Sequence, residues 1–182
     1  CPQTLTDAIV RRMSEMYGWS INQEWITWLP GMVCGLNVCC RAIADQATQV
    51  ITNTPVYPPF LSSPSNSGLT CTQVPMVLED GRFTIDFNYL QSLHTKSGDL
   101  FMLCHPHNPV GTNFNLNELT QLSEFILERG LYICSDEIHC DLILEDSLKH
   151  IPFASLSDEI AVRTITLMAP SKTFNLAGFG CS

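Results

Sequence analysis

The sequence predicts an α/β fold, a three-layer α/β/α sandwich whose mostly parallel sheet lies between helices. Three apolar runs of strand length carry this prediction, at residues 99–106, 131–137 and 164–170. Runs without polar alternation are typical of strands buried on both faces of a parallel sheet. Amphipathic sequence at 116–130, closed by a glycine, and a short helical turn at 157–162 alternate with the runs. This alternation of strands and helices is the pattern of α/β layer folds.

The first fifty residues predict two helices that flank a short strand. Residues 4–18 carry apolar side chains at helical spacing, and Gly18 suits the position just after a helix. Residues 25–31 are interpreted as a strand ending at a Pro-Gly turn, and residues 32–47 as the helix that follows.

The middle of the chain predicts shorter elements. Residues 49–55 are expected to form a short buried strand, followed by a Pro/Ser-rich loop with some helical content at 56–68. Residues 72–87 predict a hairpin with Asp80-Gly81 at its turn, because Asp-Gly favours tight β-turns. Residues 86–95 are interpreted as a short helix.

Composition excludes several classes of protein. The 182 residues carry a net charge of −9 without a Lys/Arg run, which argues against binding to nucleic-acid phosphates. No apolar stretch approaches the roughly 20 residues of a membrane span. Nine cysteines occur without a CxxC motif, and most lie in apolar runs. We therefore expect reduced core thiols in a cytoplasmic protein.

Metal binding is not expected either. His105 and His107 flank a proline but lack further ligands at suitable spacing, so we predict no metal site. Glu137 is interpreted as a structural residue.

Polar residues follow the three apolar runs directly. Asn108 comes after the first run, Asp136 ends the second and Lys172 follows the third. Ligands of open parallel sheets bind beyond the carboxyl ends of the strands, so we expect these three side chains to converge. Taken singly, each has a simpler explanation: a turn amide, a capping carboxylate and a solvated lysine.

One cofactor requires this combination of side chains. Pyridoxal phosphate needs a lysine for its Schiff base and a carboxylate opposite its pyridinium nitrogen. Its phosphate needs an anion site. The segment PGMVCGLN at 30–37 places small residues at the start of an expected helix, whose free N–H groups and positive dipole end suit a phosphate. A dinucleotide-binding domain is not favoured, because no GxGxxG follows a strand.

The chain resembles the large domain of the fold-type I, aspartate aminotransferase-like enzymes that use pyridoxal phosphate. Within them it is most similar to the cystathionine β-lyase-like (C–S lyase) subgroup. The matching motifs cover nearly the whole chain in the order of the family: YGWSINQEWITWLPGMVCGLN, ITNTPVYPPF, CHPHNPVGTNF, ICSDEIHCDLIL, HIPFASLS and TITLMAPSKTFNLAGFGCS.

The resemblance implies roles for individual residues. Lys172 would form the Schiff base and act as the catalytic residue. Asp136 would pair with the pyridine nitrogen, and we expect nearby positive charge to keep it ionised despite burial. Asn108 would bond the phenolic oxygen of the cofactor, and Tyr57 would stack on the ring.

The remaining implied residues lie around the cofactor phosphate and ring. Gly35 and Leu36 would give backbone N–H groups to the phosphate, and Ser171 would add a hydroxyl group. His139 stands where ordinary aminotransferases carry a tyrosine, which favours the lyase subgroup. A histidine simply packed at a strand end is the alternative.

The expected function is a pyridoxal-phosphate-dependent carbon–sulfur β-lyase. It would cleave L-cystathionine or L-cysteine S-conjugates to a thiol, pyruvate and ammonia. An aminotransferase and a non-catalytic regulatory homologue are the alternatives. The resemblance also implies that residues 1–182 are a partial large domain. An N-terminal segment and a C-terminal small domain would complete a homodimeric enzyme, so the isolated piece is expected to be inactive.

Overall fold

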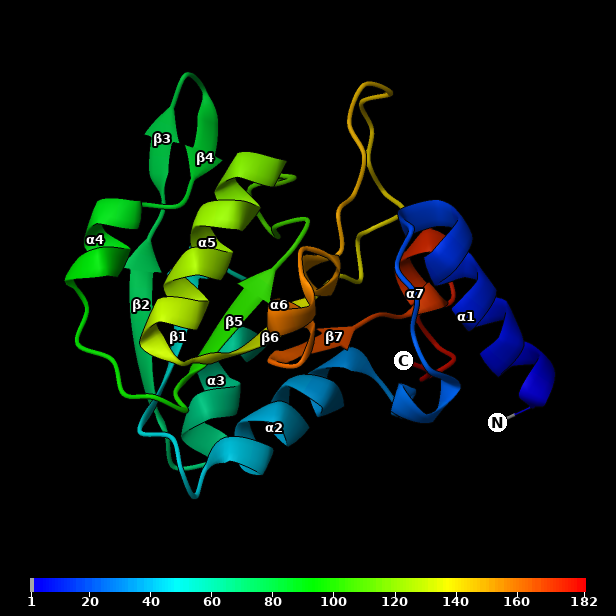
Figure 1. The fold of residues 1–182 in the computed structure, drawn as a ribbon, viewed down its shortest axis with the longest axis horizontal. Coiled ribbons are helices and arrows are strands. Elements are labelled where there is room, and N and C mark those ends of the chain that lie inside the picture. Colours follow the sequence, from blue (N-terminus) through cyan, green and yellow to red (C-terminus); the bar gives the residue numbers. More distant parts are fainter. Residues whose placement is uncertain (1) are drawn as a thin grey trace.

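The computed structural model describes residues 2–182 and contains a five-stranded sheet with helices on both faces (Figure 1). Every neighbouring pair of strands in this sheet is parallel. The strand order is β2 (Thr70–Pro75), β1 (Gln49–Thr54), β5 (Leu100–Cys104), β6 (Tyr132–Asp136) and β7 (Thr164–Leu167). The predicted α/β class with a parallel sheet is therefore confirmed.

The central strands are apolar throughout because both of their faces are covered. Along β5, Phe101 and Leu103 face one core and Leu100 and Met102 face the other. The first core is closed by α5 (Leu116–Arg129) together with α4 (Phe87–Ser92) and α6 (Asp158–Ala161). The second core is closed by α2 (Met32–Ile43) and α3 (Pro59–Asn66). The sheet thus forms the middle layer of three.

Local sequence signals set the ends of the helices. At the start of α5, Asn115 accepts a hydrogen bond from the N–H of Glu118, and the Glu118 carboxylate accepts one from the N–H of Asn115. Gly130 ends α5 with a φ of 65°. Gly18 ends α1 (Gln3–Tyr17) in the same way, with a φ of 63°. Both glycines were predicted as helix ends, and a residue with a side chain would be strained there.

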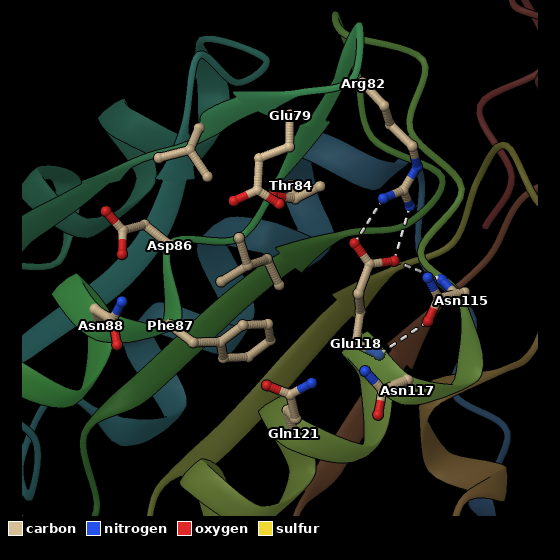
Figure 2. A pocket seen from close by; sticks show the side chains of 12 residues that line it. Glu79, Arg82, Thr84, Asp86, Phe87, Asn88, Asn115, Asn117, Glu118 and Gln121 are labelled. Atoms are coloured by element: carbon tan, nitrogen blue, oxygen red, sulfur yellow. Dashed lines mark hydrogen bonds and ion pairs between the residues drawn. The ribbon is translucent and has the colours of Figure 1, made fainter.

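The predicted hairpin consists of β3 (Val77–Glu79) and β4 (Arg82–Thr84), and Asp80-Gly81 forms its turn. Figure 2 shows how the hairpin is fastened to α5: the Arg82 guanidinium forms two hydrogen bonds, of 2.6 and 2.7 Å, with the Glu118 carboxylate. A polar hollow of about 640 Å³ lies beside this ion pair. Arg82 and Glu118 both line this hollow and bind each other, so we assign the ion pair the role of holding the hairpin against α5.

Two expectations were wrong. Residues 25–31 form no strand: a short 3₁₀ turn (Gln23–Trp25) is followed by extended chain. Leu29 exchanges two backbone hydrogen bonds with Ser182 (2.7 and 3.0 Å), but no strand ladder extends from this pair. Residues 72–75 are not part of the hairpin but belong to β2, the edge strand that pairs with β1. Most of β2 is partly exposed, so its sequence lacks the apolar run that marks the inner strands.

The connections at the carboxyl-terminal end complete the fold. A second 3₁₀ turn (Phe153–Ser155) precedes α6, and α7 (Pro170–Thr173) follows β7 directly. Asp141 links α7 to α1, because it contacts both Thr173 and Arg12. Within residues 2–182, no helix is both long and apolar enough to cross a membrane. The cysteines of this range are free thiols, four of them buried: Cys39, Cys40, Cys104 and Cys134.

Candidate functional site

The carboxyl ends of the inner strands meet at one edge of the sheet. Strands β5, β6 and β7 are neighbours in the sheet, so the segments that follow them lie side by side. From β1 the chain goes to β2 on one side, whereas β5 lies on the other side. This reversal of strand order is the place where open α/β sheets bind ligands.

A cavity of about 410 Å³ opens at this edge. Its volume lies in the range of cofactor and small-molecule sites. Six of the eight site residues named from the sequence line it: Tyr57, Asn108, Asp136, His139, Ser171 and Lys172. The structure thus brings together side chains that are far apart in the sequence, although their individual roles stay predictions.

Tyr57 and Asn108 are held together by their own loops. The backbone N–H of Tyr57 donates a hydrogen bond to the carbonyl of Asn108 (3.2 Å). His107 Nε2 donates to the carbonyl of Pro55 (2.8 Å), which ties the same two loops a second time. Because the carbonyl can only accept, this bond fixes the proton on Nε2. His107 therefore has a structural role beside the cavity, and it does not line it.

Asp136 is a buried carboxylate at the end of β6, with 4% of its surface exposed. Its Oδ1 accepts a hydrogen bond from the backbone N–H of Ile138 (3.2 Å). Burial raises the pKa of Asp136 to about 7; the charge of Glu137 adds to this and the Ile138 bond opposes it. The expectation that nearby positive charge keeps Asp136 ionised is therefore not met by the protein alone. A cationic ligand beside it would lower this pKa.

Lys172 and Ser171 lie in the single turn of α7, just after β7. Lys172 is exposed at the cavity, so its amine is accessible to a ligand. The turn is fastened from outside, because Thr173 Oγ1 donates to Asp141 (3.0 Å), which also pairs with Arg12 of α1. Helix α1 thereby contributes to the placement of Lys172.

His139 lies half-buried beside Lys172. Burial lowers the pKa of His139, a hydrogen bond with the Pro106 carbonyl opposes this, and the Lys172 charge lowers the pKa further. The lowered pKa favours the neutral form of the imidazole.

The amino end of α2 faces the same cavity. Gly31 precedes the helix without a side-chain cap, and Met32, Val33 and Cys34 of the first turn line the cavity. N–H groups of the first turn have no partner within a helix, so these residues present free donors and the positive end of the helix dipole. This arrangement suits an anionic group.

Gly35 and Leu36, which were named as the phosphate donors, do not line the cavity. The N–H of Gly35 donates to the carbonyl of Gly31 (3.1 Å), and Leu36 is fully buried in the core below α2. A Cβ on Gly35 would lie 3.1 Å from a methyl group of Leu167, so this glycine allows α2 to approach β7 closely. Met32, Val33 and Cys34 line the cavity instead. These residues were not named from the sequence; counting from the helix start identifies them, because only the first turn of a helix has free N–H groups.

The cavity therefore offers three kinds of chemistry at once. Lys172 supplies an amine, Asp136 a buried carboxylate that a cation would stabilise, and α2 an anion site. Among residues 2–182 no cluster of three or more His, Cys, Asp or Glu side chains is arranged to hold a metal ion. The arrangement fits a ligand with an electrophilic carbon, a basic ring nitrogen and a phosphate.

Comparison with known proteins agrees with this geometry. The chain is 42% identical over 181 residues to cystathionine beta-lyase PatB of Bacillus subtilis (strain 168), covering 99% of this chain and 46% of that protein. The crystal structure of OvoB superposes with a TM-score of 0.94 at 41% identity, covering 100% of this chain and 48% of that one. Cystalysin from Treponema denticola, which contains pyridoxal 5'-phosphate, superposes with a TM-score of 0.87 at 33% identity, covering 100% and 46%.

The chain spans about half the length of the curated relatives it matches, 46% in the case of PatB. The family model described as aminotransferase class I and II matches residues 2–181. Because that match covers nearly the whole chain, the protein belongs to the class I and II aminotransferase family.

Proposed function

We propose that this chain forms part of a pyridoxal-phosphate-dependent carbon–sulfur β-lyase. Its substrates would be L-cystathionine or L-cysteine S-conjugates, and its products a thiol, pyruvate and ammonia. The observation that carries the proposal is the convergence of Lys172, Asp136 and the uncapped start of α2 on one cavity. The name of the relative at 42% identity, cystathionine beta-lyase PatB, supports the lyase reaction over transamination.

The residues of the cavity fit the cofactor. The Lys172 amine would hold the aldehyde carbon, and the free N–H groups of Met32, Val33 and Cys34 would bind the phosphate. Ser171 would add a hydroxyl donor beside them. When bound, pyridoxal phosphate supplies an electron sink for the charge that develops on the substrate Cα.

Asp136 would hold a proton at the ring nitrogen of the cofactor. Burial raises the pKa of the Asp136 carboxyl group to about 7 in the protein without cofactor. A ring nitrogen in contact with it would share this proton and gain positive charge, and the resulting ion pair offsets the cost of burying the carboxylate.

Other side chains would position the cofactor and move protons. Tyr57, 41% exposed, offers a ring face at the cavity, and Asn108 offers an amide donor for the phenolic oxygen. Lys172 would release the cofactor when the amino-acid substrate binds, and its free amine would then take the Cα proton. A thiolate on the β-carbon would leave as this proton is removed.

An aminotransferase remains the second candidate because the same side chains serve both reactions. A probable transaminase and a probable aminotransferase match at 25% and 27% identity, below the cystathionine beta-lyases at 42% and 28%, whereas a solved structure of a putative aminotransferase from Clostridium difficile 630 matches at 34%. His139, in place of the tyrosine expected of aminotransferases, also supports the lyase. A non-catalytic homologue is disfavoured because Lys172, Asp136 and Asn108 are all present and share the cavity.

We also propose that the complete protein is a homodimer in the cytoplasm. The resemblance to homodimeric enzymes of this fold supports the first point, and free thiols in the core support the second. The acidic surface does not favour nucleic acid as a partner, and the expected partner is an amino-acid substrate.

The test uses the full-length gene product, purified with pyridoxal phosphate. L-Cystathionine is added without a keto acid, and pyruvate is followed over many turnovers. Steady release of pyruvate supports the β-lyase. Amino transfer that begins only when a keto acid is added would replace the lyase by an aminotransferase, and neither activity in a protein that holds the cofactor would favour the non-catalytic homologue.

A further inference from the structure

Glu137 is a fully buried carboxylate that the proposed reaction does not use. It accepts three hydrogen bonds: from the Ser135 hydroxyl (2.8 Å), from the backbone N–H of Phe153 (3.0 Å) and from His150 Nε2 (2.6 Å). A carboxylate taken this far out of water is costly unless it is both hydrogen-bonded and paired with a positive charge.

His150 is the partner that could provide this charge. Its side chain is 1% exposed, and its ring lies 4.6 Å from the ring of His105 and 5.7 Å from that of Tyr17, between centroids. Complete burial and the neighbouring His150 lower the pKa of His105 well below its usual value, so His105 stays neutral. The Glu137 carboxylate and the His150 ring therefore form a buried pair, and the neighbouring His105 adds no charge to it.

This pair lies on the other side of β6 from the cavity. Side chains alternate along a strand, so Ser135 and Glu137 share one face, and Cys134 and Asp136 share the face toward α2. The backbone at this point is held on both sides: the N–H of His105 donates to the Asp136 carbonyl, and the N–H of Glu137 donates to the Leu167 carbonyl, each at 2.8 Å. The backbone of Asp136 and Glu137 is thus fixed, with their side chains on opposite faces of the sheet.

We propose that His150 and Glu137 form a charge-compensating pair that positions Asp136 and sets its affinity for protons. Glu137 lies one residue from Asp136, and an uncompensated charge there would disfavour ionisation of the Asp136 carboxylate. A protonated His150 would offset that charge. The hydrogen bonds of Glu137 with His150 and with the Phe153 N–H also anchor residues 150–153 to the end of β6. This inference rests on the proposed role of Asp136 toward the cofactor.

Other titratable groups lie near Asp136: three thiols on the side of α2, and Lys172 and His139 at the cavity. A hydrogen bond with Cys134 lowers the pKa of the Cys39 thiol. Burial raises the pKa of Cys104 to about 12, and a hydrogen bond with Cys39 together with burial raises the pKa of Cys134. Both thiols are therefore neutral. The cavity side holds Lys172 and His139, and both residues are kept in all the variants below.

The test uses three variants of the full-length gene product: His150→Gln, Glu137→Gln and the double variant. Glutamine at 150 keeps a donor for Glu137 but carries no charge, and glutamine at 137 keeps the acceptor for Ser135 and Phe153. The exposed His94 gives a matched control, His94→Gln. The measurement is the pH dependence of the dissociation constant of pyridoxal phosphate, with the pH dependence of unfolding of the cofactor-free protein as a second readout.

His150→Gln is expected to raise the pH midpoint of both curves by about one unit, because it leaves the Glu137 charge uncompensated one residue from Asp136. The double variant restores the midpoint, and Glu137→Gln leaves it unchanged or lowers it. Unchanged midpoints in both single variants would overturn the proposal, because a structural role alone alters stability without moving a titration.

Failure to fold is also informative. If only His150→Gln fails and the double variant folds, the unpaired Glu137 charge is the cause, as proposed. If the double variant fails as well, charge compensation is refuted, because its two amides make the same bonds without charge. A protein that binds no pyridoxal phosphate would refute the proposed function, and the unfolding curves would still decide the inference about Asp136.

Discussion

Replacement of Asp136 by asparagine is expected to stabilise the cofactor-free protein and to weaken cofactor binding. The change removes a buried charge and keeps its shape, and the amide oxygen can still accept the hydrogen bond from the Ile138 N–H. One substitution is thus expected to raise the stability of the cofactor-free protein and to lower cofactor affinity. A simple capping role for Asp136 would not produce both effects.

The size of the first effect follows from the pKa of Asp136. Burial raises this pKa from 3.8 to about 7, so the folded protein holds a proton that the unfolded chain has lost between these pH values. Stability therefore falls as the pH rises from about 4 to about 7, because the folded state binds more protons there. Above about pH 7 the full cost is reached, and a difference of about 3 pKa units corresponds to about 4 kcal/mol.

The assay is urea denaturation of the cofactor-free protein from about pH 5 to about pH 8. Asp136→Asn should be more stable than the unmodified protein at the upper end, by up to about 4 kcal/mol, and the gain should shrink toward acid pH. The exposed Asp45 provides a control, Asp45→Asn, which should show no such trend. A variant that is less stable at every pH would refute the reasoning. With the cofactor present the order should reverse, because asparagine cannot compensate a cationic ring nitrogen.

Three further substitutions test other parts of the account. Lys172→Arg, which keeps the charge but not the primary amine, should abolish turnover while leaving the unfolding midpoint nearly unchanged; turnover near the unmodified rate would remove Lys172 from the mechanism. Gly35→Val should cost about 1–3 kcal/mol of stability through overpacking against β7, whereas Ala42→Val on the exposed face of α2 should cost less than about 1 kcal/mol, as measured by urea unfolding. Glu118→Gln should lose about 1–3 kcal/mol by removing the charge that pairs with Arg82, with cofactor affinity unchanged; a large loss of affinity would show that the hairpin reaches the site.

The inner strands of the sheet were predictable because strands buried on both faces consist of continuous apolar sequence. Strands β5 and β6 were recognised in this way, and α5 was recognised by its amphipathic spacing and its terminal glycine. Strand β2 was missed because it lies at the edge and is mostly accessible to solvent. The strand wrongly predicted at 25–31 is the opposite error: its apolar residues are only partly buried, and its backbone pairing is limited to the two hydrogen bonds between Leu29 and Ser182.

The side chains that line the candidate site were predictable from the sequence. The backbone donors of α2 and the buried pair of Glu137 and His150 behind the site were not. The positions of Asn108, Asp136 and Lys172 after successive strands indicated a shared cavity, because parallel strands end at the same edge. Free N–H groups depend on where a helix begins, and α2 begins at Met32, one residue after Gly31. The pairing of Glu137 with His150 joins residues on separate segments, and no local pattern in the sequence marks it.

The central claim is that Lys172 holds the cofactor. The chain contains three lysines, Lys96, Lys149 and Lys172, so the claim can be checked by chemistry on the protein itself. The full-length gene product is loaded with pyridoxal phosphate, reduced with borohydride to make the bond to the cofactor permanent, digested and analysed by mass spectrometry. We predict that the added mass lies on the peptide that contains Lys172. Added mass on another lysine instead, or on none, would contradict the account.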